Sequence, residues 1–273
     1  MKKYLYTKDN REVLIEISEP ANIPSFFVFA LPKSGSVLQD KVFEDICSEL
    51  NIPLISVAKS AFSQGVEESN FSEEICDIFL ARGYGYYGFR YFPSYLKNFD
   101  LSKFKKILLV RDPRDILVSH YFSMKNSHAI PQGEMGNRLL KQRQTIQDMD
   151  INEYVQNKAE SFLRIFQSYI NIEDDLLKVF RYEDIVFDKN KWIQHILDFL
   201  DLDLPKTKIE FIAKSHDIFP NKETPDSHIR KVTPGDYKEK LNDNSISILN
   251  EVFRDVLNRF DYDFYQKKSN IIL

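Results

Sequence analysis

The residues best suited to chemistry stand in one short polar loop, Pro32-Lys33-Ser34-Gly35-Ser36. An unalternating apolar run at 26–31 precedes the loop, and apolar residues recur at every fourth position after it. The order is therefore strand, loop, helix, in which the amides and dipole of the helix start attract an anion and a lysine adds a mobile positive charge. The loop lacks the two glycines and the Gly-Lys-Ser/Thr ending of the nucleotide triphosphatase loop. The contacts predicted for a phosphate are the Lys33 side chain and the backbone amides of Ser34, Gly35, Ser36 and Val37.

A second cationic position follows another apolar run, 105–111, which ends in Arg111. The next residues predict a helix, because Asp112 can cap it and Pro113 suits its first turn. Arg111 offers a rigid fork of donors to a phosphate, and Ser119, two turns along the helix, can donate a hydroxyl to the same group. Ligands of an open parallel sheet bind beyond the carboxyl ends of its strands. Two anion sites at neighbouring strand ends predict a ligand with two separated phosphates.

The remaining segments alternate between strand and helix signals, with no repeat and no linker between domains. The alternation predicts an α/β fold, a single three-layer P-loop-like domain over residues 1–273 with a central parallel sheet flanked by helices. Residues 1–20 are predicted to form an N-terminal hairpin extension with its turn near Lys8-Asp9-Asn10. The predicted strands are 26–31, 53–57, 86–92, 105–111 and 176–183, and the predicted helices are 38–50, one that starts after Asp112, 151–170, 189–200 and 245–260.

The composition excludes several classes of protein. A net charge of −4 gives no general affinity for nucleic acid. The two cysteines, Cys47 and Cys76, lack the CxxC spacing of a metal or redox site, and no disulfide framework is indicated. The N-terminus lacks the apolar core of a signal peptide, and the run 26–31 is far too short to span a bilayer. We therefore expect a cytoplasmic protein without a membrane span, whose oligomeric state the sequence leaves open.

The loop and the arginine segment together resemble a known family. The stretches "PKSGS" and "LLVRDPRDILVSHYF" are similar to the two nucleotide-binding signatures of PAPS-dependent sulfotransferases, where PAPS is 3'-phosphoadenosine 5'-phosphosulfate. The resemblance implies that the loop around Lys33 holds the 5'-phosphosulfate and that Arg111 and Ser119 hold the 3'-phosphate. It extends in order over residues 24–240 and leaves no further domain.

Two weaker matches belong to the same resemblance. "FRYEDI" resembles the family's Tyr-Glu-Asp segment, which implies that Tyr182 contacts adenine. "HIRKVTPGDYK" resembles a late segment that returns to the 3'-phosphate, which implies this role for Arg230 and Lys231. Ser215 and His216 fall where the family has a serine and an adenine-stacking phenylalanine, so His216 is predicted to contact the nucleotide.

The sequence departs from the family at the catalytic base. Segment 88–93, "GFRYFP", stands where related enzymes carry a histidine, and Tyr91 or Phe89 takes that position. A tyrosine with its ordinary pKa of about 10 is a poor base. A histidine side chain ordinarily titrates near neutral pH, so His120, directly after Ser119, is the preferred catalytic base. His128 and the acidic residues are the alternatives.

The resemblance implies in-line transfer of a sulfuryl group from PAPS to an acceptor hydroxyl, with Lys33 stabilising the leaving phosphate and no metal ion required. The alternatives are a non-catalytic relative that binds PAPS or its desulfated product PAP and acts through a partner, and, less favoured, a small-molecule kinase. The acceptor, a small molecule or a glycan, is expected among the hairpin, residues 59–95 and the polar stretch 126–150, which can act as a mobile lid. Four aromatic residues either line that pocket or belong to the core: Phe62, Tyr84, Tyr86 and Tyr87.

Overall fold

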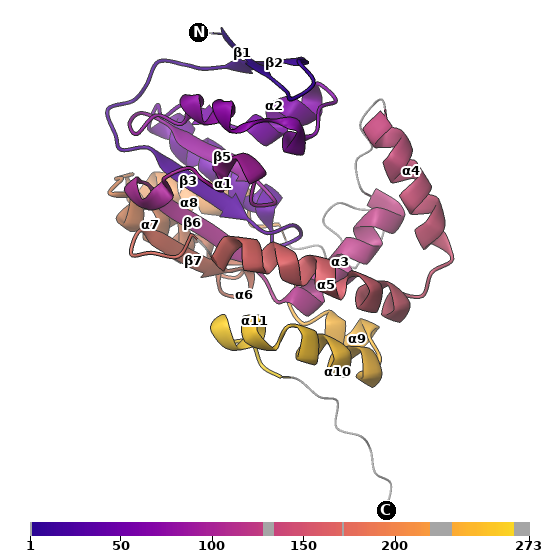
Figure 1. Cartoon of the computed structure of the whole chain (residues 1–273). Helices are drawn as coiled ribbons and strands as arrows, with labels where there is room; N and C mark the ends of the chain where they lie inside the picture. The colour runs from indigo at the N-terminus through magenta and orange to yellow at the C-terminus, as the bar shows by residue number, and fades with distance from the viewer. Residues whose placement is uncertain (1, 128–133, 171, 219–230, 265–273) are drawn as a thin grey trace, which may run out of the picture.

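A parallel sheet forms the centre of the computed structural model, which describes residues 2–127, 134–170, 172–218 and 231–264 (Figure 1). Its five strands lie in the order β4-β5-β3-β6-β7, and every neighbouring pair is parallel. The predicted α/β fold with a central parallel sheet is confirmed. The strands are β3 (Phe26–Ala30), β4 (Leu54–Ile55), β5 (Gly85–Phe89), β6 (Lys105–Val110) and β7 (Leu177–Arg181).

Strand β3 is central because both of its faces are buried, as its unalternating apolar sequence predicts. Phe27 and Phe29 point into one apolar cluster, and Phe26 and Val28 into another on the opposite face. Successive side chains of a strand alternate between the faces of a sheet, so one short run of apolar residues holds together two layers of helices.

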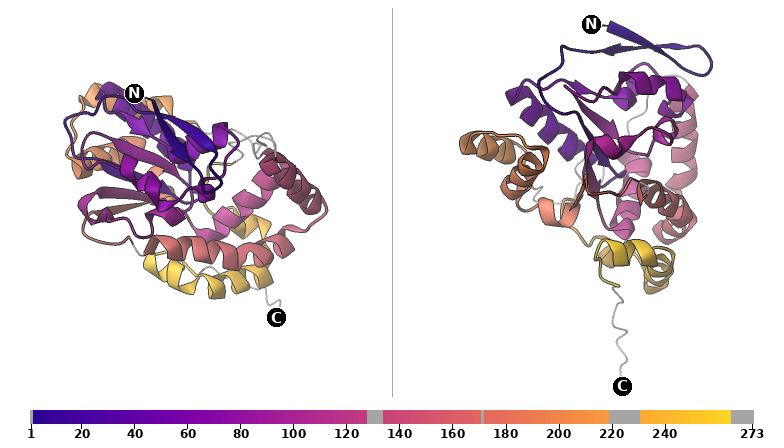
Figure 2. Two further views of the ribbon diagram at one scale, coloured as in Figure 1. Left: turned by 45° about the horizontal axis from the view of Figure 1, so that its top comes forward. Right: turned by 60° about the vertical axis from the view of Figure 1, so that its left-hand side comes forward.

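Helices cover both faces of the sheet, as the two apolar clusters and the views in Figure 2 show. One face is covered by α1 (Ser36–Glu49), α7 (Lys189–Leu200) and α8 (Lys206–Ser215). The other is covered by α2 (Val57–Ser63), α3 (Pro113–Phe122), α5 (Ile151–Ile170), α10 (Asp243–Val252) and α11 (Arg254–Arg259).

The N-terminal hairpin forms a separate sheet of two antiparallel strands, β1 (Lys2–Tyr6) and β2 (Glu12–Glu16), as predicted. Asn10 adopts a positive φ of 61° in the turn between them. The side-chain amide of Gln64, at the end of α2, brackets Leu14 by accepting from its N–H and donating to its carbonyl, both at 3.0 Å. The hairpin is thereby attached to the segment that follows α2.

Several boundaries differ from the sequence prediction because capping and tertiary contacts set them. The predicted strand 53–57 stops early, since Ser56 caps α2 by accepting from the N–H of Lys59. The strand predicted at 176–183 ends at Arg181, and the helix predicted at 245–260 is divided between α10 and α11. A further long helix is α4 (Glu134–Gln147). The short elements are α6 (Tyr182–Ile185), α9 (Tyr237–Lys240), η1 (Glu68–Asn70), η2 (Glu73–Ile78), η3 (Ser94–Leu96), η4 (Leu101–Lys103) and η5 (Ser123–Ser127).

Helix α4 occupies much of the stretch 126–150, so the described part of the predicted lid is helical (Figure 1). Its role as a lid stays a prediction. No helix in the described ranges is both long and apolar enough to cross a membrane.

Arg114 fastens the C-terminal helices to the sheet edge. Its buried guanidinium donates from Nε and Nη2 to both oxygens of Asp112, at 2.9 and 2.7 Å. It also donates to Asn250 Oδ1 at 2.6 Å and to the carbonyl of Asp263 at 2.7 Å. A buried charge is tolerated only when it is paired and hydrogen-bonded, and this one is bonded from both sides.

Removal of the Arg114 charge is therefore expected to destabilise the protein strongly. Arg114→Met leaves the Asp112 carboxylate buried without its partner and should lower the free energy of unfolding by about 3–5 kcal/mol. Arg254→Met, which breaks an exposed ion pair with Glu251, should cost about 1 kcal/mol or less. Urea denaturation of both variants measures the difference, and equal losses would contradict the anchoring role.

Candidate functional site

The loop after β3 has the shape of an anion cradle. Lys33 and Gly35 both adopt left-handed conformations, with φ of 63° and 91°, and Gly35 caps α1 without any side-chain hydrogen bond. Between them Ser34 is fully buried, and its N–H and hydroxyl donate to the carbonyl of Leu31 at 3.2 and 2.7 Å. Ser36 is buried in the first turn of α1, whereas Val37 is 39% exposed. Ser34 thus shapes the loop, while the first turn of α1 receives no cap from a side chain.

Arg111 meets this loop from the end of β6. Its Nη1 donates to the carbonyl of Lys33 at 3.3 Å, and its Nη2 lies 3.4 Å from Asp115. The guanidinium stands 4.5 Å from the ring centre of Tyr182, and its buried Nε has no hydrogen-bond partner among the described residues. The structure therefore brings Lys33 and Arg111 together at adjacent strand ends, and it leaves one donor of Arg111 unsatisfied.

Tyr182 connects three segments that are distant in the sequence. Its hydroxyl donates to the carbonyl of Val232 at 2.9 Å, and its ring lies over Arg111. The same ring faces Gly35, where an added Cβ would stand 2.7 Å from Cδ2 of the tyrosine. Tyr182 is therefore a wall of the cradle. The adenine contact that the resemblance implies for it stays a prediction.

Asp115 brings the late segment to the site, a role that the sequence did not reveal. Its buried carboxylate accepts from the N–H of Gly235 at 2.7 Å and from the N–H of Tyr237 at 3.0 Å. Lys231, in the same segment, is paired with Asp236 at 3.0 Å and with Glu239 at 2.8 Å. Arg230 lies outside the described residues.

The other predicted nucleotide contacts lie on α3 and α8. Ser119 is half-buried, two turns along α3 from Arg111. His216, at the end of α8, lies with its Nε2 2.7 Å from Asp45 Oδ2 of α1, and Ser215 donates to the carbonyl of Ile212 within α8. His216 thus joins α8 to α1, and its predicted stacking on adenine stays a prediction.

A carboxylate that the sequence analysis passed over supports the same strand ends. Glu183 accepts from the N–H of Asp112 at 3.0 Å and from the hydroxyl of Tyr262 at 3.0 Å. Burial raises the pKa of Glu183, and the Asp112 bond and the Arg111 charge partly offset this. Glu183 is the middle residue of the Tyr-Glu-Asp segment, so that motif contained a signal for its position.

The candidate base His120 lies between α3 and α5. Its Nδ1 is 2.6 Å from the hydroxyl of Tyr154, and its ring meets Phe162 edge-on at 5.0 Å between ring centres. Three of the four aromatic residues considered for the acceptor pocket, Tyr84, Tyr86 and Tyr87, are buried in the core. Phe62 is exposed.

Arg90 connects the end of β5 with the start of α1. Its Nη2 lies 2.5 Å from Asp40 and 3.5 Å from the carbonyl of Ser36, in the cradle. Lys59 of α2 also pairs with Asp40, at 3.1 Å. The cradle is thus bordered by cationic side chains on the β5 side as well as on the β6 side.

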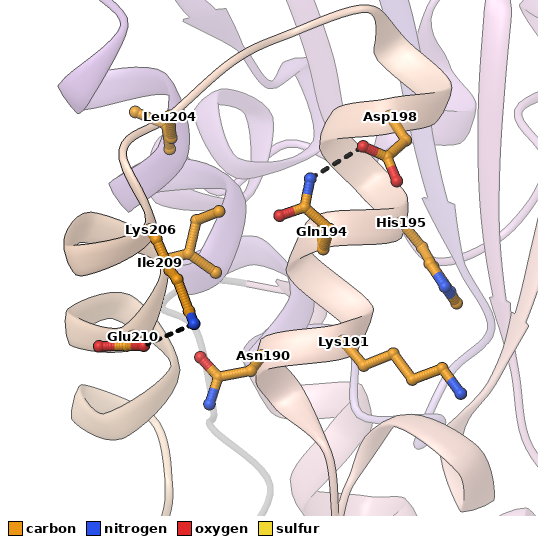
Figure 3. A pocket seen from close by; sticks show the side chains of 9 residues that line it. All are labelled: Asn190, Lys191, Gln194, His195, Asp198, Leu204, Lys206, Ile209 and Glu210. Atoms are coloured by element: carbon orange, nitrogen blue, oxygen red, sulfur yellow. Dashed lines mark hydrogen bonds and ion pairs between the residues drawn. The ribbon is translucent and has the colours of Figure 1, made fainter.

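A groove of about 560 Å³ lies apart from these residues, between α7 and α8 (Figure 3). Its walls carry both signs of charge, and Gln194 donates to Asp198 along α7 at 2.8 Å. None of the predicted site residues lines it. The lining residues are Asn190, Lys191, Gln194, His195, Asp198, Leu204, Lys206, Ile209 and Glu210.

Within the described ranges, no group of three or more histidine, cysteine, aspartate and glutamate side chains is placed to hold a metal ion. Burial raises the pKa of Cys47 to about 12, and burial and nearby acidic groups raise that of Cys76 to about 11. Neither thiol is therefore activated as a nucleophile.

The fold and the cradle together define a nucleotide-binding α/β domain with cations at neighbouring strand ends. Residues 24–261 match the family profile described as the sulfotransferase domain. The chain therefore belongs to the sulfotransferase family, and sulfotransfer is its activity.

Solved structures show the same fold. Mouse sulfotransferase SULT7A1 complexed with PAP is 19% identical, with a TM-score of 0.57 over 89% of this chain and 86% of that one. Retinol dehydratase in complex with androsterone and the inactive cofactor PAP is 14% identical, with a TM-score of 0.53 over 97% and 92% of the two chains. A search of curated protein sequences returned no match.

The close approach of Gly35 to Tyr182 predicts a difference between two glycines of positive φ. Gly35→Ala adds a Cβ against the ring and should cost about 2–4 kcal/mol of stability. Gly235→Ala, at φ 87° but with its nearest neighbour 3.9 Å away, should cost about 1–2 kcal/mol. Thermal unfolding of both variants measures this, and equal losses would show that the ring does not press on Gly35.

Proposed function

We propose that this chain transfers a sulfuryl group from PAPS to the hydroxyl of a small-molecule or glycan acceptor. The observation that carries the proposal is Arg111, which is buried, bonded to the carbonyl of Lys33 and left with an unsatisfied Nε. An unpaired buried donor is costly, and an anion at the cradle would satisfy it. The residues present fit a ligand with two separated anionic groups.

PAPS, when bound, supplies an activated sulfuryl group on its 5'-phosphate. The amides of Gly35, Ser36 and Val37 would hold this end, and Lys33 would stabilise the charge that develops on the leaving phosphate. For Ser34 this role requires that its N–H exchange the carbonyl of Leu31 for the ligand. Arg111 and Ser119, with Arg230 and Lys231, would hold the 3'-phosphate, and Tyr182 and His216 would contact the base. For Lys231 this role requires that its ammonium exchange Asp236 and Glu239 for the phosphate.

His120 enters the proposal as the base predicted from the sequence, with its Nδ1 directed at Tyr154. We propose that the acceptor binds among the hairpin, residues 59–95 and the stretch 126–150. We also place the protein in the reducing cytoplasm, since both of its cysteines are free. The structure of retinol dehydratase, which has the same fold, is a complex with androsterone, and this supports a small-molecule acceptor.

Selective stabilisation by PAP tests the nucleotide part of the proposal. At one hundred times its dissociation constant PAP should add about 2.7 kcal/mol, a rise in Tm of about 5 °C, while ADP and ATP at the same concentration add less. Arg111→Ala and Arg111→Lys should abolish most of the shift, because neither offers a guanidinium fork. The exposed Arg164→Ala should keep it. Equal shifts with all three nucleotides would contradict the proposal.

A further inference from the structure

The acceptor side of the site needs a base that the β5 segment does not supply. Phe89 is buried within β5, and Tyr91, which is 52% exposed, has a pKa raised by burial. A raised pKa makes a phenol a weaker acid, so its basic form is scarcer still at neutral pH. The base must therefore come from another element, and the candidates are His120 of α3 and a carboxylate bonded near the end of β5.

Glu68 of η1 is bonded to a tyrosine that closely follows the segment in which the histidine is missing. The hydroxyl of Tyr95, two residues after Pro93, donates to Glu68 Oε1 at 2.5 Å. Tyr95 is buried, so this bond fixes the carboxyl group in place and leaves the contacts of its second oxygen to a ligand. The thiol of Cys76 donates to the carbonyl of Tyr95 at 3.1 Å and helps to hold that residue in place.

A second buried tyrosine that packs against this segment has an unsatisfied hydroxyl. Tyr169 of α5 is 3% exposed, and its hydroxyl has no hydrogen-bond partner among the described residues. Its ring is held edge-on by Phe29 of β3, at 5.6 Å, and by Phe92, at 5.7 Å, between ring centres. Burial raises the pKa of Tyr169, and the charge of Glu68 adds to this rise.

Arg90 connects this pair with the cradle. Its guanidinium bonds Asp40 and the carbonyl of Ser36 in the first turns of α1. Its charge also lowers the pKa of Glu68. Both groups also contact residues that follow the end of β5, because Tyr95 holds Glu68 and Phe92 packs on Tyr169. The ion pair of Glu67 with Arg138 joins α4 to the segment that contains Glu68.

The titration of Glu68 suits proton transfer. Burial raises its pKa from 4.5 to about 7, although the Tyr95 bond and the Arg90 charge lower it in part. The other titratable groups that act on it are Tyr95, Tyr169 and Arg90, and both tyrosines have raised pKa values and stay neutral at this pH. A base is most effective when its pKa lies near the working pH.

We infer that Glu68 is the general base for the acceptor hydroxyl and that the Tyr169 hydroxyl holds the same oxygen. The inference rests on the proposed function. The acceptor O–H gives its proton to Glu68, and its oxygen forms the bond to sulfur. The bond from sulfur to the phosphate oxygen breaks with its electron pair on the phosphate, beside Lys33. Glu68 then releases the proton to solvent, and no metal or oxidant takes part.

The first test needs no substrate. Since folding raises the pKa of Glu68, its contribution to stability is present below pH 4.5 and is lost as the pH rises through about 7. The Tm of Glu68→Gln relative to wild type should therefore rise between pH 5 and pH 8, by on the order of 4 °C. Glu67→Gln, on the same segment, should show no such trend. A difference that does not change with pH overturns the inference whichever acceptor is used.

The second test follows transfer from radiolabelled PAPS to para-nitrophenol, benzyl alcohol, methyl glucoside and water over the same pH range. Glu68→Gln should lower kcat/KM by about 10²–10⁴. It should also remove the rise of kcat/KM with pH near pH 7, while PAP still raises the Tm of the variant. Tyr169→Phe should raise KM for the acceptor while it raises the Tm of the nucleotide-free protein.

His120→Gln distinguishes the two candidate bases. If the rise of kcat/KM near pH 7 disappears in His120→Gln and survives in Glu68→Gln, the inference about Glu68 is wrong. If PAP fails to stabilise the wild type, the proposed function fails instead, and the pH dependence of Tm still reports on Glu68.

Discussion

The buried guanidinium of Arg111 is the interaction on which the site depends. A charge removed from water is stable only with partners, and those partners come from three different strand ends. The carbonyl of Lys33 lies after β3, Asp115 lies on the helix after β6, and Tyr182 follows β7. Because Arg111 needs all of them, its burial aligns the cradle with the rest of the sheet edge.

The partners of Arg111 in turn hold segments that are distant in the chain. Asp115 accepts two backbone N–H groups from Gly235 and Tyr237, and Tyr182 donates to Val232. The late segment is therefore fastened by its backbone rather than by its basic side chains. Lys231 itself is held at the edge of the fold by ion pairs with Asp236 and Glu239. A ligand can replace these ion pairs.

The proposed nucleotide side and the proposed acceptor side of the site differ in their chemistry. The former is built from cations and backbone amides, which suits fixed negative charge. The latter gathers hydroxyls and a carboxyl group, namely Tyr95, Tyr169 and Glu68, in surroundings that favour neutral forms. Arg90 stands between them and bonds the first turns of α1. This difference suits the reaction, because the sulfuryl donor is anionic and the acceptor is a neutral hydroxyl.

The strand-loop-helix around Lys33, the parallel sheet and the position of Arg111 at a strand end could all be predicted from the sequence. These follow from local rules: apolar runs buried on both faces, turn residues, and the Asp112-Pro113 helix start. Three contacts became visible only in the tertiary structure. They are the packing of Tyr182 on Gly35, the polar contact of His216 with Asp45 and the hydrogen bond of Tyr95 to Glu68. Such contacts join residues far apart in the chain and leave no periodic pattern, because they depend on how whole elements pack. Glu68 could not be chosen from 41 acidic residues until its burial was known.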